Sequence, residues 1–268
     1  MISIIISTYQ PTYCKALHDN IAETIGDVDY EVISIDNPGI MGICEAYNTG
    51  AKRARYPYLC FVHEDVLFQT PNWGLHLIAH FDDPDVGAIG VAGSAYKSYV
   101  PTTWSVFKPY IAMNLIQHFK ASGTATQLYH IQPDTNTKRY QVVTLDGVFM
   151  ATRQSIWQQY PFDTKTFDGF HGYDMDFSLQ IGAQHSLFVV FDILLEHFSE
   201  GSPNKDWMAA AMAVSTKWKA HLPKHCMARL SETDQLQLEA QAKTALKNRL
   251  KRFGYTALYR KLLYLKYL

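Results

Sequence analysis

A short apolar run that ends on two adjacent carboxylates constrains the fold of this chain most strongly. Residues 58–62 carry few polar atoms, and His63, Glu64 and Asp65 follow directly. Such a run predicts a strand covered on both faces, as in a parallel sheet, where ligands gather at the carboxyl ends of the strands. Two carboxylates there repel a phosphate group unless a divalent cation lies between them. The pair predicts a cation that binds a diphosphate, although a solvated turn is the simpler alternative.

Strand-like and helix-like segments alternate in the amino-terminal part of the chain. Apolar, β-branched runs predict strands, and the segments between them have the length of helices. This alternation predicts an α/β fold with a mostly parallel central sheet, wound by right-handed crossovers and flanked by helices. The predicted strands are residues 2–7, 31–36, 58–63 and 86–92, and the predicted helices are residues 12–25, 42–55 and 72–81.

Regular patterning stops at residue 93 and resumes near residue 140. The interval mixes aromatic residues with prolines and keeps no period, which predicts an elaborated loop over a binding face. Beyond it, the apolar pattern predicts strands at 140–152 and 187–191 and helices at 174–182, 204–220 and 231–252. A chain of 268 residues accommodates one such α/β domain with a helical tail.

The amino terminus and the cysteines indicate an intracellular protein. Strand-like residues follow Met1 without the features of a secretory signal, and no apolar run approaches the length of a membrane span. The four cysteines are far apart, which favours reduced thiols over disulfides or a zinc site. We expect a cytoplasmic location, with any membrane contact peripheral and at the inner face of the cell membrane.

Charge is distributed unevenly along the chain. The net charge is −1, but eight of the 24 basic residues and none of the 25 acidic residues lie in residues 243–268. Leucines and tyrosines alternate with these cations, a mixture typical of a helix on an anionic membrane surface. A helical cap on the preceding domain or a contact between two subunits is the alternative. The acidic remainder of the chain argues against nucleic acid as a partner.

The ends of the first two predicted strands carry candidate nucleotide ligands. Asp36 closes the second strand and is followed by Asn37, where a carboxylate accepts hydrogen bonds from a ribose hydroxyl or a base N–H. No G-x-G-x-x-G follows the first strand, and Thr8 and Tyr9 stand there instead. This argues against a dinucleotide and favours a single nucleotide. A turn-forming role for Asp36 remains the alternative.

Four segments, taken in order, resemble family 2 glycosyltransferases of the GT-A fold. They are the strand end at residues 7–9, Asp36-Asn37, the helix at 45–51 and the strand end at 61–65, and the resemblance extends over roughly residues 1–200. It implies a hexosyltransferase that uses a nucleotide-diphosphate sugar, UDP-sugar first, with Mn²⁺ or Mg²⁺ at the acidic triplet. Here His63 takes the first position of the triplet, so the metal role falls on Asp65, and Glu64 is expected to face ribose or sugar.

Three downstream motifs acquire roles from the same resemblance. Asp146 and Gly147 are expected under the donor sugar, although an Asp-Gly strand bend is an alternative. Asp174, at a predicted helix start that would keep it ionised, is expected to be the general base, with a plain N-cap as the alternative. Asp176 is expected to orient this loop. His197 is expected to add a metal ligand, with a structural histidine as the alternative.

The implied reaction is an inverting transfer of the sugar to a hydroxyl group of a saccharide or lipid-linked acceptor, in surface glycan biosynthesis. Residues 1–203 would form the catalytic domain, with a nucleotide-binding half at 1–92 and an acceptor and catalytic half at 93–203. Residues 204–268 would form a helical extension with a basic amphipathic tail. One rival function is a sugar-nucleotide pyrophosphorylase, but the glycine-rich basic loop expected after the first strand of such an enzyme is absent from this sequence. The other is a non-catalytic nucleotide- or carbohydrate-binding module.

Overall fold

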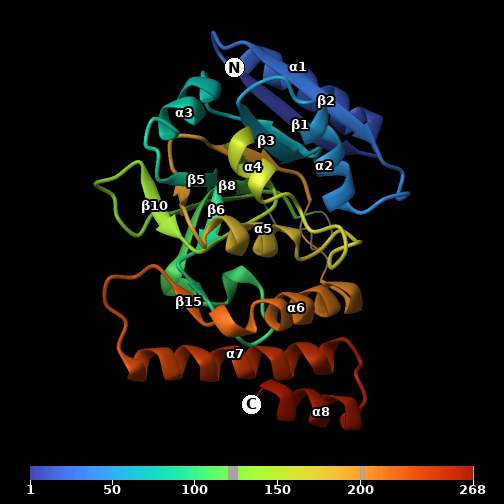
Figure 1. The fold of residues 1–268 in the computed structure, drawn as a ribbon, viewed down its shortest axis with the longest axis vertical. Coiled ribbons are helices and arrows are strands. Elements are labelled where there is room, and N and C mark those ends of the chain that lie inside the picture. Colours follow the sequence, from blue (N-terminus) through green and yellow to red (C-terminus); the bar gives the residue numbers. More distant parts are fainter. Residues whose placement is uncertain (120–125, 200, 202, 268) are drawn as a thin grey trace.

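The computed structural model describes residues 1–119, 126–199, 201 and 203–267. Its amino-terminal part consists of two successive β–α–β units, as the sequence predicts (Figure 1). Proline at the first position of α1 suits a helix start, because its fixed φ and missing N–H cost nothing there. The elements are β1 (Ile2–Thr8), α1 (Pro11–Thr24), β2 (Tyr30–Asp36), α2 (Ile43–Arg53) and β3 (Tyr58–His63).

A seven-stranded sheet forms the centre of the protein. Strands β1, β2, β3, β5 and β13 run in one direction, and β10 and β12 run against them. The predicted α/β fold with a mostly parallel sheet is therefore confirmed. The strand order is β10-β13-β5-β12-β3-β1-β2, with β5 (Val86–Gly90), β10 (Arg139–Val142), β12 (Phe149–Arg153) and β13 (Ser186–Val190).

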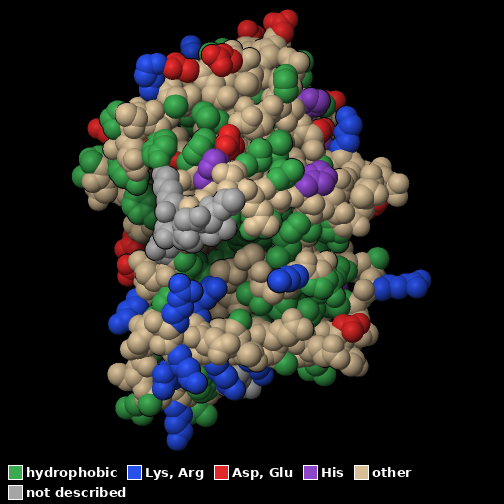
Figure 2. Space-filling view, turned by 180° about the vertical axis from the view of Figure 1, so that it is seen from behind, with side chains coloured by type: hydrophobic (Ala, Val, Ile, Leu, Met, Phe, Trp, Pro, Cys, Tyr) green, Lys and Arg blue, Asp and Glu red, His purple; other side chains and the backbone are tan. Residues whose placement is uncertain are grey.

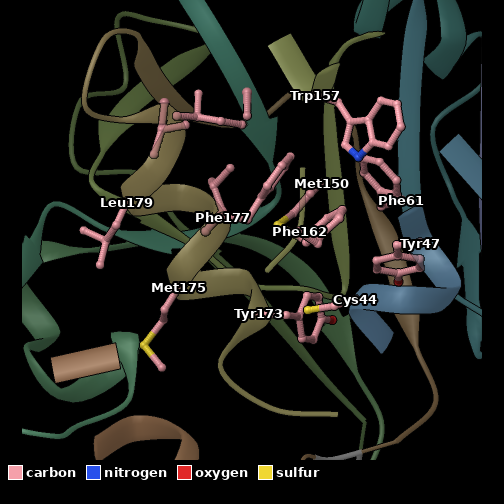
Figure 3. Packing of buried hydrophobic residues seen from close by; sticks show 14 of the residues in the cluster. Cys44, Tyr47, Phe61, Met150, Trp157, Phe162, Tyr173, Met175, Phe177 and Leu179 are labelled. Carbon is pink, nitrogen blue, oxygen red and sulfur yellow. The ribbon is translucent and has the colours of Figure 1, made fainter. Parts of the chain in front are cut away.

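Helices cover both faces of this sheet because side chains of each central strand alternate between the faces. In β1, Ile5 packs with α2, α4 (Gln154–Gln159) and α5 (Tyr173–Ile181), whereas Ile4 and Ile6 pack with α1 and α3 (Trp73–His80). Figure 3 shows the first of these clusters, where Tyr47 of α2 and Phe61 of β3 face Phe162 and the aromatic side chains of α5.

A second sheet occupies part of the segment predicted to be an irregular loop, so that prediction is wrong for residues 111–117 and 127–131. Asn114 interrupts the apolar pattern of β8 but is buried, and its amide donates hydrogen bonds to the carbonyl oxygens of Phe191 and Ile193. This tertiary pairing could not be seen in the sequence. The order is β11 (Thr144–Leu145), β6 (Ala92–Ser94), β8 (Ile111–Gln117), β14 (Leu195–His197) and β4 (Val66–Phe68), with β9 (Gln127–Ile131) also on β8.

Three helices follow the sheets and pack beneath them in Figure 1: α6 (Lys205–Lys217), α7 (Glu232–Arg252) and α8 (Ala257–Tyr267). Before α7, β15 (Lys224–His225) pairs with β7 (Tyr96–Lys97). Leu238, Leu246 and Leu250 of α7 share an apolar cluster with Tyr96 and Phe107. Helix α7, whose second half belongs to the basic tail, thus packs on the preceding domain, as one of the alternatives predicted.

Two further expectations concern the chain as a whole. All four cysteines are free thiols in the structure. Among the described residues, the structure has no helix with the length and apolar character needed to span a bilayer.

Candidate active site

The carboxyl ends of the central strands bring the predicted site residues to one edge of the sheet. Ser7 at the end of β1 is paired with His63 at the end of β3, and Thr8 is paired with Asp36. The chain then turns sharply from β3 into β4, and in the second sheet His197 of β14 is paired with Val66. The pairing of β14 with β4 therefore brings His197, from a distant part of the sequence, beside the β3–β4 turn.

His63, Asp65 and His197 form a cluster with the geometry of a metal site. One potential ligand atom of each residue lies within 4.8 Å of those of the other two. The Nε2 atom of His197 is 3.6 Å from Oδ1 of Asp65. Glu64, which separates the first two residues in the sequence, points elsewhere. His63 therefore takes the metal-facing position that the sequence analysis had not assigned to it.

Hydrogen bonds orient both imidazoles so that each presents a lone pair. Gln117 donates its amide hydrogens to the carbonyl oxygens of His118 and Ser199, so its Oε1 must accept from Nδ1 of His197 at 3.0 Å. The Nε2 atom of His197 is buried and has no hydrogen-bond partner. A buried nitrogen left unpaired in this way, with the other ring nitrogen tied down, is typical of a metal ligand.

His63 is held in a similar manner. The hydroxyl group of Tyr173 donates to the carbonyl oxygen of Gly147 at 3.2 Å, so it accepts from Nε2 of His63 at 2.9 Å. The Nδ1 atom of His63 is then the nitrogen with the free lone pair. Burial, with help from the neighbouring His197, lowers the pKa of His63, so the imidazole is neutral at neutral pH and able to bind a cation.

Asp65 is ionised throughout the physiological range. Burial acts to raise the pKa of Asp65, but its neighbours His197, Ser199 and His63 lower it far below its ordinary value. One carboxylate and two imidazoles thus face a common point.

Glu64 binds the loop between β1 and α1. Its Oε2 accepts hydrogen bonds from Oγ1 of Thr8 at 2.5 Å, from the backbone N–H of Tyr9 at 3.2 Å and from that of Gln10 at 3.0 Å. Its Oε1 is buried and unpaired. The carboxylate lies before α1, where the helix dipole favours negative charge, and one oxygen remains available toward the cavity beside it.

Asp146 and Gly147 lie beside His63, as the sequence predicts for a common site. Oδ2 of Asp146 accepts a hydrogen bond from Nε1 of Trp104 at 2.7 Å, and Oδ1 accepts one from the N–H of Val148 at 2.9 Å. A Cβ atom at Gly147 would come within 2.0 Å of the Tyr173 hydroxyl oxygen. Glycine is therefore required for the contact that orients His63, a reason different from the expected approach of a sugar.

Asp174 differs from the ionised carboxylate that was expected. The helix α5 begins after Gly172, so Asp174 lies in its first turn and is not the N-cap. Burial and the charge of Asp146 raise the pKa of Asp174 to about 7, against hydrogen bonds from backbone N–H groups. Near neutral pH the group is an even mixture of acid and base, which is the state from which a side chain accepts a proton efficiently.

Asp176 faces the opposite way from Asp174 and connects α5 to α6. Its carboxylate accepts hydrogen bonds from Nε1 of Trp218 at 2.7 Å, from Nζ of Lys217 at 2.9 Å and from Nε2 of Gln180 at 2.8 Å. These contacts fix the start of α5 and hence the position of Asp174.

Two cavities adjoin at these residues, and His63, Phe170 and Tyr173 line both. The smaller, about 210 Å³, is also lined by Glu64 and Asp65. The larger, about 470 Å³, has among its lining residues Trp104, Asp146, Asp174, His197 and Trp207. The metal-type cluster thus lies at the junction of an acidic pocket and a wider pocket with several aromatic walls.

Not every predicted ligand lines these cavities. Tyr9 lines the smaller one and is 64% exposed. Thr8 is bonded to Glu64, and the buried amide of Asn37 is bonded to Ser7 of β1 and to Met41 of its own loop. Asp36 is exposed at the strand end and lines neither of the two cavities.

Sequence reasoning missed four residues that build this site: His63 as a ligand, Tyr173, Gln117 and Trp104. The sequence could have indicated Tyr173, because it directly precedes Asp174. Successive residues at a helix start point in different directions, so Tyr173 can contact a different part of the site from Asp174. Gln117 and Trp104 lie in the segment without a period, where no local signal identified them.

The sequence matches the family described as "Glycosyltransferase like family" over residues 2–228. No curated protein matches it. Among solved structures it is similar to GalNAc-T7 crystallised with UDP, GalNAc and Mn²⁺, with a TM-score of 0.53 and 11% identity. That match covers 82% of this chain, which spans about half (48%) of the GalNAc-T7 chain. The similarity confirms the GT-A type of fold.

Weaker similarities involve two other proteins. The mannosyltransferase PcManGT from Pyrobaculum calidifontis, in complex with GDP-Man and Mn²⁺, aligns with a TM-score of 0.46 and 13% identity over 98% of this chain and 82% of that chain. TarS 1–349 from S. aureus aligns with a TM-score of 0.48 and 12% identity over 94% of this chain and 82% of that chain.

Proposed function

The chain belongs to the glycosyltransferase-like family, and from this premise we propose that it transfers a sugar from a nucleotide-diphosphate sugar to an acceptor hydroxyl group, with inversion. One observation carries the proposal: the His63–Asp65–His197 cluster and Asp174 open into adjoining cavities. A diphosphate bound at the cluster would have its sugar directed toward Asp174. UDP-sugar is the first donor to test, because the structurally similar GalNAc-T7 was crystallised with UDP.

His63, Asp65 and His197 would hold the divalent cation. The fit rests on the unpaired, buried Nε2 of His197 and on a donor set of two imidazoles and one carboxylate. Nitrogen ligands disfavour Mg²⁺, which prefers oxygen, so we propose Mn²⁺. Such a cation would neutralise the charge that the leaving diphosphate gains. Mn²⁺ is also the ion with which GalNAc-T7 and PcManGT were crystallised.

Asp174 would act as the general base. The acceptor oxygen attacks the anomeric carbon of the donor and its proton passes to the Asp174 carboxylate, while the bond between that carbon and the diphosphate oxygen breaks. A pKa near 7 suits this role, because the unprotonated form is available at neutral pH and still binds a proton. Asp146, held by Trp104, would hydrogen-bond the donor sugar and would keep the pKa of Asp174 high.

The remaining donor contacts follow the smaller cavity. Tyr9 offers an exposed ring on which a base can stack, and Oε1 of Glu64 is free to accept a hydrogen bond from ribose. Thr8 and Asn37 would act by fixing the loops around the nucleotide, since Thr8 is bonded to Glu64 of the β3–β4 turn and Asn37 to Met41 of its own loop. Asp36, exposed at the end of β2, would bind the nucleotide from the rim.

The larger cavity would receive the acceptor. Its aromatic walls, Trp104, Phe170 and Trp207, suit stacking on the apolar faces of sugar rings. We propose a saccharide or lipid-linked acceptor in surface glycan biosynthesis, and an enzyme that works in the cytoplasm at the inner face of the membrane. In this proposal, residues 1–203 form the catalytic domain and residues 204–268 form a helical extension that supports it.

Calorimetry with UDP, GDP and ADP, each with and without Mn²⁺, tests this proposal. We expect one diphosphate to bind, and only with Mn²⁺. His197→Gln should abolish this Mn²⁺-dependent binding. His221→Gln, at an exposed histidine outside both cavities, should behave as the wild type. Metal-independent binding would argue for a plain nucleotide-binding module, and the absence of any diphosphate binding would contradict the proposal. Release of pyrophosphate from a nucleoside triphosphate and a sugar 1-phosphate would identify a pyrophosphorylase instead.

A further inference from the structure

Three leucines form an exposed stripe along α8. Leu258, Leu262 and Leu265 are 72%, 55% and 77% exposed, and their spacing of four and three residues aligns them on one face of the helix. Tyr259, stacked on Tyr255, lies at the edge of the stripe and is 41% exposed. Single exposed leucines are ordinary, but three in a row on the last helix call for a partner.

The stripe is not needed to hold α8 in place. Leu263 and Tyr267, on the other side of the helix, are buried in the apolar cluster that contains Leu246 and Leu250 of α7. The hydroxyl groups of Tyr267 and Thr216 are 3.3 Å apart, which adds a contact with α6. The exposed leucines therefore project away from the protein on a helix that is already docked by its opposite face.

Basic side chains accompany the stripe. No acidic residue occurs after Glu239, Lys261 is exposed next to Leu262 on α8, and Lys251 and Arg252 are exposed in the last turn of α7. Within the described part of the chain, none of these three cations forms a salt bridge. Figure 2 shows Lys and Arg side chains gathered with hydrophobic ones over the carboxy-terminal helices, and acidic ones gathered at the opposite end of the molecule.

We propose that α8 binds an anionic membrane surface, with Leu258, Leu262 and Leu265 inserted among the lipid chains and Lys251, Arg252 and Lys261 at the head groups. The combination of an apolar stripe, flanking lysines that can extend toward head groups and an aromatic edge fits the boundary of a bilayer. The negative charge of anionic lipids complements a surface that has no acidic residue of its own.

A second copy of the chain fits this surface less well. An isologous dimer would bring the same cations of both copies together, which is unfavourable without acidic partners. Three leucine side chains also fall well short of the roughly 800 Å² per partner that a stable interface buries. A membrane needs neither a matching acidic surface nor a large area.

Flotation of the full-length protein with vesicles tests the inference without requiring turnover. We expect binding to vesicles of phosphatidylglycerol and phosphatidylcholine, weakened by salt, and little binding to phosphatidylcholine alone. The variant Leu258→Ser/Leu262→Ser/Leu265→Ser should lose binding. Leu236→Ser, at a leucine of α7 that is 72% exposed, is the matched control and should bind as the wild type. Lys251→Gln/Arg252→Gln/Lys261→Gln should weaken binding on the order of 100-fold.

Each alternative outcome overturns the inference. Equal binding to neutral vesicles would remove the role of charge, and unchanged flotation of the triple serine variant would remove the role of α8. A wild-type dimer in light scattering that becomes monomeric in the triple serine variant would identify a second copy as the occupant. Mn²⁺-dependent diphosphate binding, measured on the same variants, reports whether the donor site is intact and so separates a failure here from a failure of the proposed function.

Discussion

The first turn of α5 holds two enclosed carboxylates in opposite surroundings. Asp176, on the side of α6, accepts hydrogen bonds from three side chains: Gln180, Lys217 and Trp218. Asp174, on the side of the cavities, receives no side-chain hydrogen bond from any described residue, and its charge faces that of Asp146. Two residues apart, one carboxylate is used to hold helices together and the other is left open toward the cavity.

The same contrast separates structural from ligand-binding groups elsewhere in the molecule. Nε2 of His197 and Oε1 of Glu64 are buried without hydrogen-bond partners, and both residues line the cavities. A fully paired buried group stabilises the fold, whereas an unpaired one costs free energy that a ligand bound in the cavity would recover. Identical substitutions on the two sides of α5 should therefore have opposite effects.

The largest expected effect is the loss of transfer in Asp174→Asn. An amide cannot take the acceptor's proton, so kcat should fall by about 10² to 10⁴-fold. Diphosphate binding in the presence of Mn²⁺ should be unchanged, because Asp174 is not part of the metal-type cluster. Steady-state kinetics and calorimetry measure the two quantities on one preparation, and undiminished turnover would eliminate Asp174 as the base.

The matching substitution Asp176→Asn should act on stability. An amide offers one acceptor oxygen, so a buried donor among Trp218, Lys217 and Gln180 is left facing an N–H group. Burial raises the pKa of Asp176 even though Lys217 and Trp218 lower it, so we expect the cost of one unpaired donor and not that of a whole ion pair. The free energy of unfolding should fall by about 1–3 kcal/mol in urea denaturation. An unchanged value would contradict a structural role for this carboxylate.

Asp174→Asn should instead stabilise the metal-free protein at pH 8. A carboxyl whose pKa is about 7 in the folded state and about 4 in the unfolded state binds more protons when folded, so stability falls as pH rises through this window. The amide of the variant does not ionise, so its stability does not fall in this way. At pH 8 the free energy of unfolding should be on the order of 2 kcal/mol higher than in the wild type. The difference should shrink at pH 5, and a destabilised variant at pH 8 would refute the raised pKa.

The smallest effect is expected at Gln117, which contacts His197 and not the cation itself. Gln117→Leu removes the acceptor that fixes Nδ1 of His197, so the imidazole can turn away from Asp65. Such partners of metal ligands typically affect affinity 10- to 100-fold, and we expect Mn²⁺ affinity to fall by roughly 10-fold. Gln69→Leu, at a glutamine that pairs with Glu196 on the outside of β14, is the control. If both variants bind Mn²⁺ with the same affinity, Gln117 does not orient His197 for metal binding.

The sequence predicted the elements that carry a local pattern. The β–α–β units followed from apolar periodicity, Glu64 and Asp65 were singled out because acids at the end of an apolar strand are unusual, and Asp174 was singled out by the family resemblance. Strand β8 was missed because Asn114 is satisfied by carbonyl oxygens of a distant segment. The place of His63 in the metal-type cluster was missed because it depends on Tyr173 and on the pairing of β14 with β4, neither of which leaves a local signal.

We propose that His63, Asp65 and His197 would together hold a cation that binds the donor's diphosphate next to Asp174. The most direct measurement is the anomalous density of manganese in a crystal soaked with Mn²⁺ and the diphosphate selected by calorimetry. We predict one strong peak within bonding distance of all three side chains, with the diphosphate in the smaller cavity. A peak elsewhere, or a diphosphate bound away from this cluster, would contradict the account.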